Sequence, residues 1–166
     1  LLSCRTLWKR KVAAKSLRTA LLRVVQSGSI LYCTLEFVAD FVFCSGPSME
    51  PTIKSGDVVL TEHISVIFNK IRKRDVVICK SPKSPKDYIC KRVIAMEGDN
   101  VYNTDSNNFT NVRRGHVWLE GDNKDNSSDS RNYGQVPYGL LRGRVFFVLW
   151  PLYRAGPLGL DTEKSF

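Results

Sequence analysis

Short runs rich in β-branched and aromatic residues recur between residues 57 and 150, and turn-forming residues separate them. Side chains of this kind suit a pleated, half-buried surface, so each run predicts a strand. Helical patterns do not alternate with the runs, which argues against a parallel α/β sheet. The sequence therefore predicts a mainly β fold with a mixed or antiparallel sheet, whose strands fall within Asp57–Ile64, Asp75–Lys80, Tyr88–Met96, His116–Glu120 and Arg144–Trp150.

A largely apolar segment, Val24–Cys44, precedes this β-rich part. Its 21 residues match the length of roughly 20 that a helix needs to cross a bilayer. Glu36 and Asp40 share one helical face, where a carboxylate at membrane depth costs about 2.5 kcal/mol or more. The segment predicts an N-terminal membrane-anchor helix, and the alternative is an amphipathic helix packed against the β domain.

The positive charge of the chain is concentrated at its start. The formal net charge is +9, but residues 1–23 hold seven basic residues and no acidic one, whereas the remainder has 18 basic against 16 acidic residues. The excess belongs to a tail, which argues against a nucleic-acid-binding face. We expect a basic tail (1–23), the anchor (24–44), a folded β domain (45–151) and a weakly ordered C-terminal tail (152–166).

The five cysteines do not predict a metal or redox centre, because they are odd in number and contain no CxxC pair. Free or buried thiols are the favoured interpretation, since disulfides are scarce in intracellular chains. A cross-strand disulfide between Cys79 and Cys90 is the alternative.

The segment SGPSMEPT, residues 45–52, surrounds a serine with two prolines and a glycine. Proline fixes φ and glycine permits turns that other residues cannot make, so Ser48 is held by its neighbours. A nucleophile benefits from such preorganisation. An ordinary turn after a helix has the same composition, and the segment is not the GxSxG elbow of α/β-hydrolases.

Lys91 is the candidate general base. In the predicted strand, Ile89, Lys91, Val93 and Ala95 alternate onto one face, and three of the four are apolar. Burial there would disfavour the ammonium form and lower the lysine pKa. The alternative is an edge-strand lysine whose amine reaches solvent, and Arg92 on the opposite face is expected to be solvated.

The loop GDNKDNSSDSR, residues 121–131, is rich in Asp, Asn and Ser. It fails the calcium EF-hand template, because Ser127 or Ser130 stands where that template requires glycine. Such side chains satisfy the loop backbone and can supply hydroxyls that orient a neighbouring lysine. Neither this loop nor any other motif predicts a metal or a cofactor.

In chain order, the apolar segment, SGPSMEPT, GDVVL, KRVIAMEGD and GDNKDNSSDSRNYGQVP resemble the type I signal peptidase family, and the similarity extends from about Ser45 to Pro151. The resemblance implies a serine endopeptidase with a Ser–Lys dyad, built on a signal-peptidase-like, mostly β catalytic domain with an N-terminal membrane-anchor helix. Ser48 falls at the nucleophile position and Lys91 at the general-base position.

The resemblance also implies supporting roles for other residues. Ser127 matches the hydroxyl that orients the lysine, Asp129 and Arg131 match an ion pair beneath it, and Met49 matches a wall of the substrate pocket.

One position departs from the family pattern. Many bacterial members carry a serine two residues before the nucleophile, and its hydroxyl completes the oxyanion hole, but Gly46 stands there in this chain. The backbone N–H of Ser48 remains a donor, and Ser45 is the candidate for the second. Loss of one such donor typically costs about 2.7–4 kcal/mol.

Within the family, the chain looks most like the mitochondrial inner membrane branch. Only 21 residues, Asn100–Glu120, separate the fourth and fifth motifs, which is too few for the large second β domain of many bacterial members. Lys91 also argues against the endoplasmic reticulum branch, which carries histidine there. The likeness implies a heterodimer with a second catalytic subunit, anchorage in the lipid bilayer, a catalytic domain in the intermembrane space, and presequence-bearing precursors as substrates.

Other classes remain open. A catalytically silent scaffold or substrate-presenting subunit would share these motifs. A self-cleaving repressor with a similar dyad would need a helix-turn-helix, which residues 1–44 do not supply. A Ser-His-Asp hydrolase would need His63 or His116, and both fall within predicted strands.

Overall fold

A computed structural model describes residues 18–33 and 39–158. The chain divides into two units, residues 1–38 and residues 39–166. In the first unit, residues 18–33 are helical. Within the described ranges, no helix combines the length and apolar character needed to cross a bilayer. Glu36 and most of the predicted basic tail lie outside the described residues.

The predicted anchor segment 24–44 does not form a single helix. Residues 24–33 are helical, but Ala39–Phe43 form strand β1, which pairs antiparallel with β2 (Val58–Glu62). The aromatic and β-branched residues of β1 suit a strand, and the ladder to β2 satisfies their backbone groups. The helix prediction is therefore wrong over residues 39–43, which belong to the second unit.

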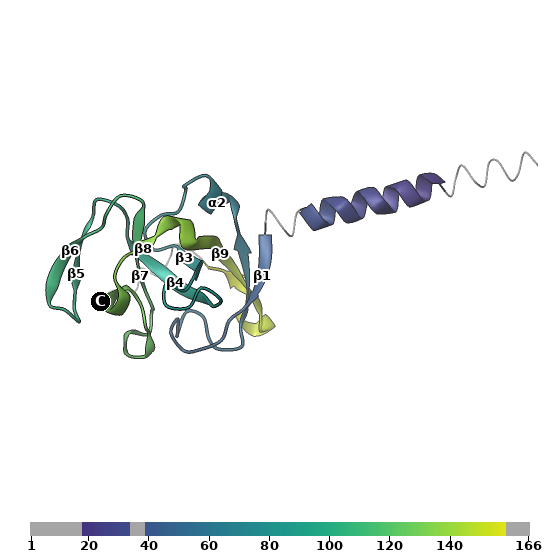
Figure 1. Ribbon diagram of the computed structural model, residues 1–166. Coiled ribbons are helices and arrows are strands. Elements are labelled where there is room, and N and C mark those ends of the chain that lie inside the picture. The colour runs from purple at the N-terminus through teal and green to yellow at the C-terminus, as the bar shows by residue number, and fades with distance from the viewer. Residues whose placement is uncertain (1–17, 34–38, 159–166) are drawn as a thin grey trace, which may run out of the picture. The chain divides into compact units, whose positions relative to one another are not determined.

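The second unit is a curled antiparallel β structure, in agreement with the mainly β prediction (Figure 1). Its main sheet has the order β1-β2-β9-β3-β4-β7-β8, with β10 paired to β9. The five predicted runs are confirmed as β2, β3, β4, β7 and β9. The bounds of the remaining strands are β3 (Val76–Lys80), β4 (Tyr88–Ala95), β5 (Asn100–Asn103), β6 (Asn108–Asn111), β7 (His116–Glu120), β8 (Val136–Pro137), β9 (Leu141–Trp150) and β10 (Gly156–Pro157), and those of the short helices are α2 (Ile64–Ile67), η1 (Lys124–Asn126), α3 (Ser130–Tyr133), η2 (Tyr138–Leu140) and η3 (Leu152–Arg154).

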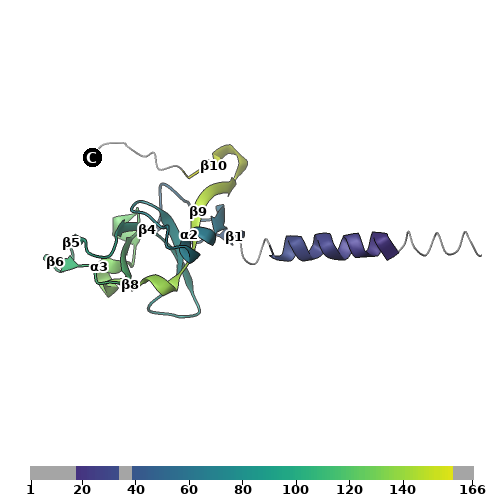
Figure 2. The ribbon, with the colours of Figure 1, turned by 90° about the horizontal axis from the view of Figure 1, so that it is seen from above.

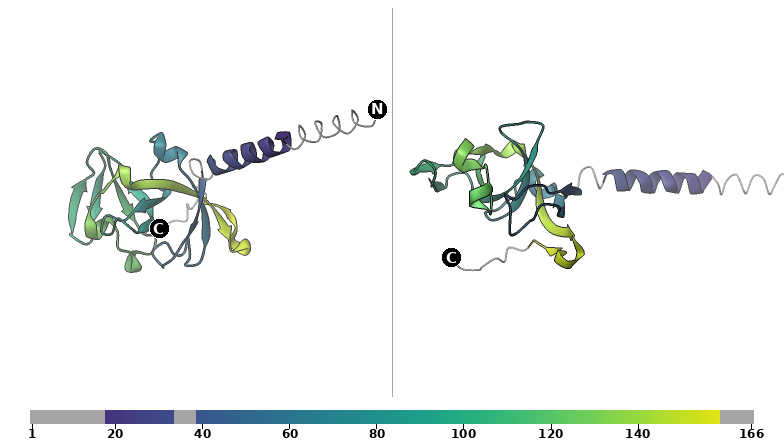
Figure 3. Two further views of the ribbon diagram at one scale, coloured as in Figure 1. Left: turned by 45° about the vertical axis from the view of Figure 1, so that its right-hand side comes forward. Right: turned by 90° about the horizontal axis from the view of Figure 1, so that it is seen from below.

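Strand β9 connects the two halves of the sheet. Its first half pairs with β3 and its second half with β2, with register shifts in both ladders, which bend the sheet (Figure 3). Apolar side chains on the two faces form separate buried clusters. The first cluster contains Cys44, Met49, Ile53, Val59, Val76, Ile78, Val145 and Val148, and the second contains Ile71, Val77, Cys79, Val93, Val117, Leu119, Val136 and Leu141.

Strands β5 and β6 form a separate two-stranded sheet at one end of the second unit (Figures 1 and 2). Strand β6 lies in an Asn-rich stretch and is not among the five strands predicted from the sequence. Cross-strand packing explains the difference, because the rings of Tyr102 and Phe109 lie 5.1 Å apart. This small hairpin lies within Asn100–Glu120, the segment that the sequence analysis found too short for a large second β domain.

The described part of the segment after β9, residues 151–158, contacts the rest of the second unit. Arg154 of η3 forms an ion pair of 2.7 Å with Asp57, β10 pairs with β9, and Leu158 packs against the first apolar cluster. The expectation of a weakly ordered tail is wrong for residues 152–158, because this segment has both a charged and an apolar partner.

Candidate active site

Ser48 lies in the loop that joins β1 to β2, residues 44–57. The loop is closed at its base by two backbone hydrogen bonds, from Cys44 N–H to Asp57 O (2.8 Å) and from Gly56 N–H to Cys44 O (2.9 Å). Inside it, Glu50 N–H donates to Pro47 O and Ile53 N–H to Met49 O, forming consecutive turns around Ser48. The half-buried serine thus sits in a hairpin loop with a fixed base.

Arg154 holds the same loop from outside. Its guanidinium donates to Asp57 Oδ2 at 2.7 Å and to the carbonyl oxygens of Pro51 and Thr52 at 3.2 and 3.1 Å. Three contacts from one planar group fix both the end of the loop and its middle.

Lys91 lies on β4 and is only 3% exposed. Val93 and Ala95 share its buried face, which confirms the alternation predicted from the sequence. Burial lowers the pKa of Lys91 below its ordinary value, while the carboxylate of Asp129 opposes this shift. Among the described residues, no ion pair includes Lys91. The geometry favours an amine that loses its proton more readily than a solvated lysine.

Ser48 and Lys91 line one pocket of about 150 Å³. The pocket lies between the Ser48 loop on one side and strands β3 and β4 on the other. Most of the lining residues are apolar. Its walls are formed by Val42, Phe43, Cys44, Ser45, Gly46, Met49, Ile53, Ile78, Tyr88, Ile89 and Cys90.

The donors expected for an oxyanion hole lie at the mouth of this pocket. Among the described residues, neither the N–H nor the hydroxyl of Ser48 has an intramolecular hydrogen-bond partner, so both are available. Gly46 has φ +98°, a conformation that favours glycine, and its N–H donates to Ser55 Oγ at 3.2 Å. Ser45 is exposed and lines the pocket, whereas the Gly46 N–H is already used.

Met49 has two roles in the structure. It lines the pocket and is only 2% exposed, because it also packs in the first apolar cluster. Its side chain therefore anchors the Ser48 loop to the core as well as forming a pocket wall.

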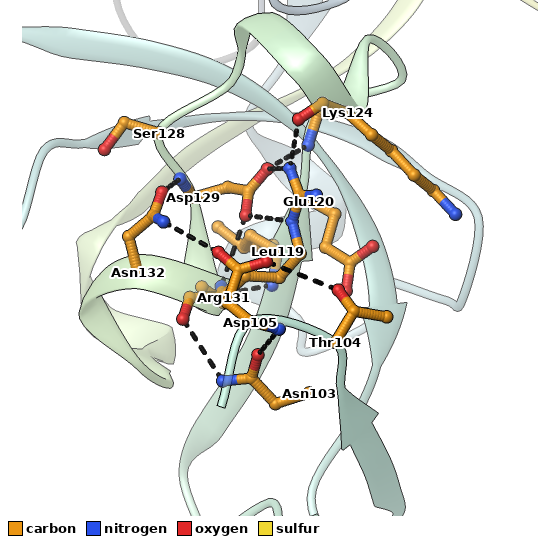
Figure 4. Close-up of polar contacts among 12 residues, drawn as sticks. Asn103, Thr104, Asp105, Leu119, Glu120, Lys124, Ser128, Asp129, Arg131 and Asn132 are labelled. Atoms are coloured by element: carbon orange, nitrogen blue, oxygen red, sulfur yellow. Dashed lines mark hydrogen bonds and ion pairs between the residues drawn. The ribbon is translucent and has the colours of Figure 1, made fainter. Parts of the chain in front are cut away.

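Asp129 and Arg131 form the ion pair expected from the family likeness. The Asp129 side chain is fully buried and accepts hydrogen bonds from Arg131 Nε at 2.9 Å, Arg131 Nη2 at 2.9 Å, Arg131 N–H at 3.2 Å and Gly121 N–H at 3.0 Å. Figure 4 shows the two side chains facing each other, with Asn132 beside them completing a capping box at the start of α3. The carboxylate thereby joins the end of β7 to the start of α3.

The electrostatics of this pair follow from its contacts. Burial alone would raise the pKa of Asp129, but the bonds from Arg131 and from Gly121 N–H outweigh burial and hold the pKa below its usual value. Asp129 in turn raises the pKa of Arg131. A permanent carboxylate therefore lies within electrostatic range of Lys91.

Gly121 brings the 121–131 loop against Ser48. A Cβ at Gly121 would overlap the side chain of Ser127 and the carbonyl oxygen of Ser48, and Asn123 N–H donates to that same carbonyl at 3.0 Å. Ser127 Oγ lies close to the Asp129 carboxylate without meeting hydrogen-bond geometry, so it is a buried hydroxyl without a partner. The structure thus places Ser127 beside the backbone of the candidate nucleophile.

Sequence reasoning missed a second network. Arg92 was expected to be solvated, but its side chain is only 17% exposed and forms a bidentate pair with Asp122 at 2.7 and 2.6 Å. Thr52 Oγ1 donates to Asp122 Oδ2 at 2.5 Å. The expectation is wrong because the pair with Asp122 withdraws the Arg92 guanidinium from solvent. The sequence did not reveal this pair, since Asp122 is distant in sequence from both Arg92 and Thr52. The network links the serine loop, the lysine strand and the 121–131 loop.

The alternative cysteine pairing is also wrong. The register pairs Cys79 with Ile89 and Cys90 with Ile78, so the two thiols lie on opposite faces of the sheet. Cys33, Cys44, Cys79 and Cys90 are all free, in agreement with the favoured interpretation for the described part of the chain.

The sequence of this chain is similar to those of known proteases. A family model described as signal peptidase, peptidase S26, matches residues 17–108 and 101–150. The human mitochondrial inner membrane protease subunit 1 is 52% identical over 144 residues, covering 81% of this chain and 87% of that protein. The mitochondrial ATP-independent inner membrane protease subunit 1b of Arabidopsis thaliana is 40% identical over 136 residues, covering 78% and 80%.

Two further similarities extend the comparison. The mouse mitochondrial inner membrane protease subunit 2 is 41% identical over 123 residues, covering 70% of each chain. A crystal structure of a signal peptidase I from Enterococcus faecalis overlaps 45% of this chain and 95% of that chain, with a TM-score of 0.38 and 20% identity. Because that overlap is partial, the assignment rests on the sequence matches. The chain belongs to the signal peptidase family, peptidase S26, and is a serine endopeptidase of the signal peptidase type.

Proposed function

We propose that Ser48 and Lys91 are the catalytic dyad with which this chain removes presequences and sorting signals from proteins delivered to the mitochondrial intermembrane space. The single observation that carries the assignment of the dyad is that the serine hydroxyl, which is free of other partners, and a buried lysine line the same pocket. The mitochondrial inner membrane proteases among the relatives support the membrane, and the basic N-terminal tail supports the side of that membrane.

The chemistry follows from these two groups. Neutral Lys91 Nζ accepts the proton of Ser48 Oγ as this oxygen attacks the scissile carbonyl. The resulting lysine ammonium returns the proton to the leaving amine, and an acyl-enzyme on Ser48 remains. The leaving amine is the new N-terminus of the mature protein, so the ester on Ser48 holds the presequence. A water that gives its proton to Lys91 then attacks this ester and releases the presequence. The Ser48 N–H donates to the developing oxyanion, with the Ser45 hydroxyl as the second donor.

The substrate is an extended peptide added to a strand edge. Strand β1 ends the order of the main sheet, and β4 pairs with β7 only from Arg92 onward, so Tyr88–Lys91 have one edge without a β7 partner. Both segments line the pocket. Main-chain hydrogen bonds along such an edge give affinity, and the apolar pocket selects an uncharged side chain next to the scissile bond.

Three further residues position the dyad without entering the reaction. Ser127 supplies a buried hydroxyl that has no other partner, to orient the Lys91 amine. Asp129 and Arg131 hold the loop that carries Ser127, through the bonds to Gly121 and the cap of α3.

The chain's placement at the membrane is part of the same proposal. Seven basic residues and no acid in residues 1–23 favour retention of the N-terminus on the matrix side, with the catalytic domain in the intermembrane space. The apolar residues that follow anchor the chain in the lipid bilayer. The relatives include a subunit 2 of the mitochondrial inner membrane protease. We therefore expect this chain to form a heterodimer with a second catalytic subunit of that kind.

The test is cleavage of a presequence-junction substrate by the full chain reconstituted in membranes, with and without the second subunit. Ser48→Ala and Lys91→Met should each lower kcat at least about 10³-fold, because either change removes the nucleophilic step. Ser128→Ala and Lys86→Met are matched controls, since both side chains are exposed and away from the pocket. Unchanged cleavage in both dyad variants would show that the activity belongs to another subunit and that this chain is a scaffold.

The pH dependence tests the base separately. Activity should rise from pH 5 toward mildly alkaline pH as Lys91 loses its proton. A flat profile between about pH 5 and pH 9 would contradict the role of Lys91 as the base.

A further inference from the structure

Two thiols that the proposed mechanism does not use line the catalytic pocket. Cys44 closes the base of the Ser48 loop through both of its backbone groups, and it is only 8% exposed. Cys90 immediately precedes Lys91 on β4 and is partly exposed. Both side chains line the pocket, and Cys90 packs against the apolar cluster that contains Cys44.

Each thiol changes the ionisation of the other. The interaction with Cys90 lowers the pKa of Cys44, and the same interaction raises the pKa of Cys90. Cys44 is therefore the thiol that ionises first. Cys79 differs from both, because burial in the second cluster raises its pKa to about 12.

We propose that Cys44 and Cys90 are a modification site, a thiol pair that is reversibly oxidised to a disulfide by a small-molecule disulfide such as oxidised glutathione. Their shared pocket and the apolar cluster that contains Cys44 and packs against Cys90 carry this inference, because bond formation needs two cysteines that lie close together. The site joins the base of the Ser48 loop to the strand that carries Lys91.

The exchange proceeds in two balanced steps. The Cys44 thiolate attacks one sulfur of the glutathione disulfide, which forms a mixed disulfide and expels one glutathione thiolate. Cys90 gives its proton to that leaving thiolate and attacks Cys44 Sγ, which expels the second glutathione. Two protein thiols are thereby oxidised while one glutathione disulfide is reduced to two thiols.

The bond has a consequence for the pocket. It replaces two separate side chains by one short bridge and draws the Ser48 loop toward β4, which leaves less room for a substrate side chain. We expect oxidation to raise KM for a presequence peptide about threefold to tenfold, and reduction with dithiothreitol to restore it. This kinetic effect rests on the proposed function, whereas formation of the disulfide does not.

The chemical test uses the full chain in membranes, equilibrated with defined ratios of reduced and oxidised glutathione. Remaining thiols are alkylated, the protein is digested without reduction, and linked peptides are identified by mass spectrometry. A peptide joining Cys44 to Cys90, two hydrogens lighter than the sum of its parts and lost on reduction, is expected. Its fraction should rise with the proportion of oxidised glutathione.

Variants separate this site from general oxidation. Cys79→Ala should leave the linked peptide unchanged, whereas Cys44→Ala and Cys90→Ala should abolish it, with circular dichroism confirming that each variant is folded. Folded wild-type protein that yields no linked peptide, only mixed glutathione adducts, or a bond through Cys79 or Cys33, would overturn the proposal. Loss of proteolysis in all samples would count against the proposed function and leave the disulfide result intact.

Discussion

The two loops that meet beside Ser48 are stabilised in opposite ways. The loop of residues 44–57 is closed at its base by backbone hydrogen bonds and is held from outside by Arg154. The loop of residues 121–131 is held from within. The buried carboxylate of Asp129 accepts three hydrogen bonds from Arg131 and one from Gly121, and all three residues belong to this loop.

The difference separates reactivity from support. In the first loop, the Ser48 hydroxyl and N–H have no hydrogen-bond partner in the described part of the chain, as a nucleophile and an oxyanion donor require. In the second loop, Asp129 and Arg131 pair with each other and can hold Ser127 and Gly121 in place. Changes to this pair or to Gly121 should therefore affect stability more than changes at the reactive groups.

Asp129→Asn should have the largest effect on stability. It leaves the Arg131 guanidinium without its charge partner, and breaking a buried pair typically costs about 3–5 kcal/mol. Chemical denaturation at pH 7 measures the loss of free energy of unfolding. Asp125→Asn is the control, because that side chain is exposed in the same loop.

The pH dependence of the same pair has a definite sign. Because the pKa of Asp129 is lowered in the folded state, its contribution is present above its unfolded pKa of about 4 and is lost as pH falls through the folded pKa. The difference between wild type and Asp129→Asn should shrink below about pH 4. An equal difference at pH 3 and pH 7 would show that charge is not the cause.

Gly121→Ala tests the contact between the loops. The new Cβ would overlap Ser127 and the Ser48 carbonyl, so the loops must move apart, at a cost of about 1–3 kcal/mol. Thermal unfolding and the cleavage assay should both show a loss. Gly139→Ala places its Cβ in open space and is the matched control. Equal behaviour of the two variants would contradict the close approach at Gly121.

Lys91→Met should stabilise the folded state while removing activity. Burial lowers the folded pKa of Lys91 from its ordinary value of 10.5, so at neutral pH the protonated amine destabilises the native state. The gain arises because the substitution removes this buried charge. It should be complete below the folded pKa and disappear as pH rises toward 10.5.

Denaturation curves at pH 7 and pH 10 measure this difference. Lys86→Met, on the exposed surface, should stay within about 0.5 kcal/mol of wild type at both pH values. A loss of stability in Lys91→Met at pH 7 would show that the amine has a favourable partner in the folded state.

Ser127→Ala should have the smallest effect on stability. Its buried hydroxyl has no partner, so removal should change the free energy of unfolding by less than about 1 kcal/mol. If the hydroxyl orients Lys91, kcat should fall about tenfold and the acid limb of the pH profile should shift. A stability loss above about 2 kcal/mol with an unchanged pH profile would assign Ser127 a purely structural role.

Local patterns predicted most of the sheet. The strands β2, β3, β4, β7 and β9 follow from alternation and from β-branched and aromatic residues, and the buried position of Lys91 follows from the same alternation. Strand β1 could not be predicted in this way, because its apolar residues continue the hydrophobic run of the preceding segment. Hydropathy does not separate a helix from a strand within such a run.

Features that depend on distant partners were harder to predict. The ion pair of Arg92 and Asp122 joins residues 30 positions apart, and the family likeness carried no role for either. Gly121 was visible in the GDN motif, but its close approach to Ser48 depends on how β7 ends beside the serine loop. The shared pocket of Cys44 and Cys90 likewise depends on the closure of the β1–β2 loop.

The clamp made by Arg154 has a consequence for the order of events in the life of the chain. The arginine and the Asp57 carboxylate that it binds are separated by 97 positions, so the serine loop obtains its outer support only after synthesis has passed residue 154. Contacts between such remote parts form late, since the entropy of closing a long loop must first be overcome. A nascent or partly translocated chain would therefore hold its nucleophile in an unfinished loop, which would delay proteolytic competence until the enzyme is complete.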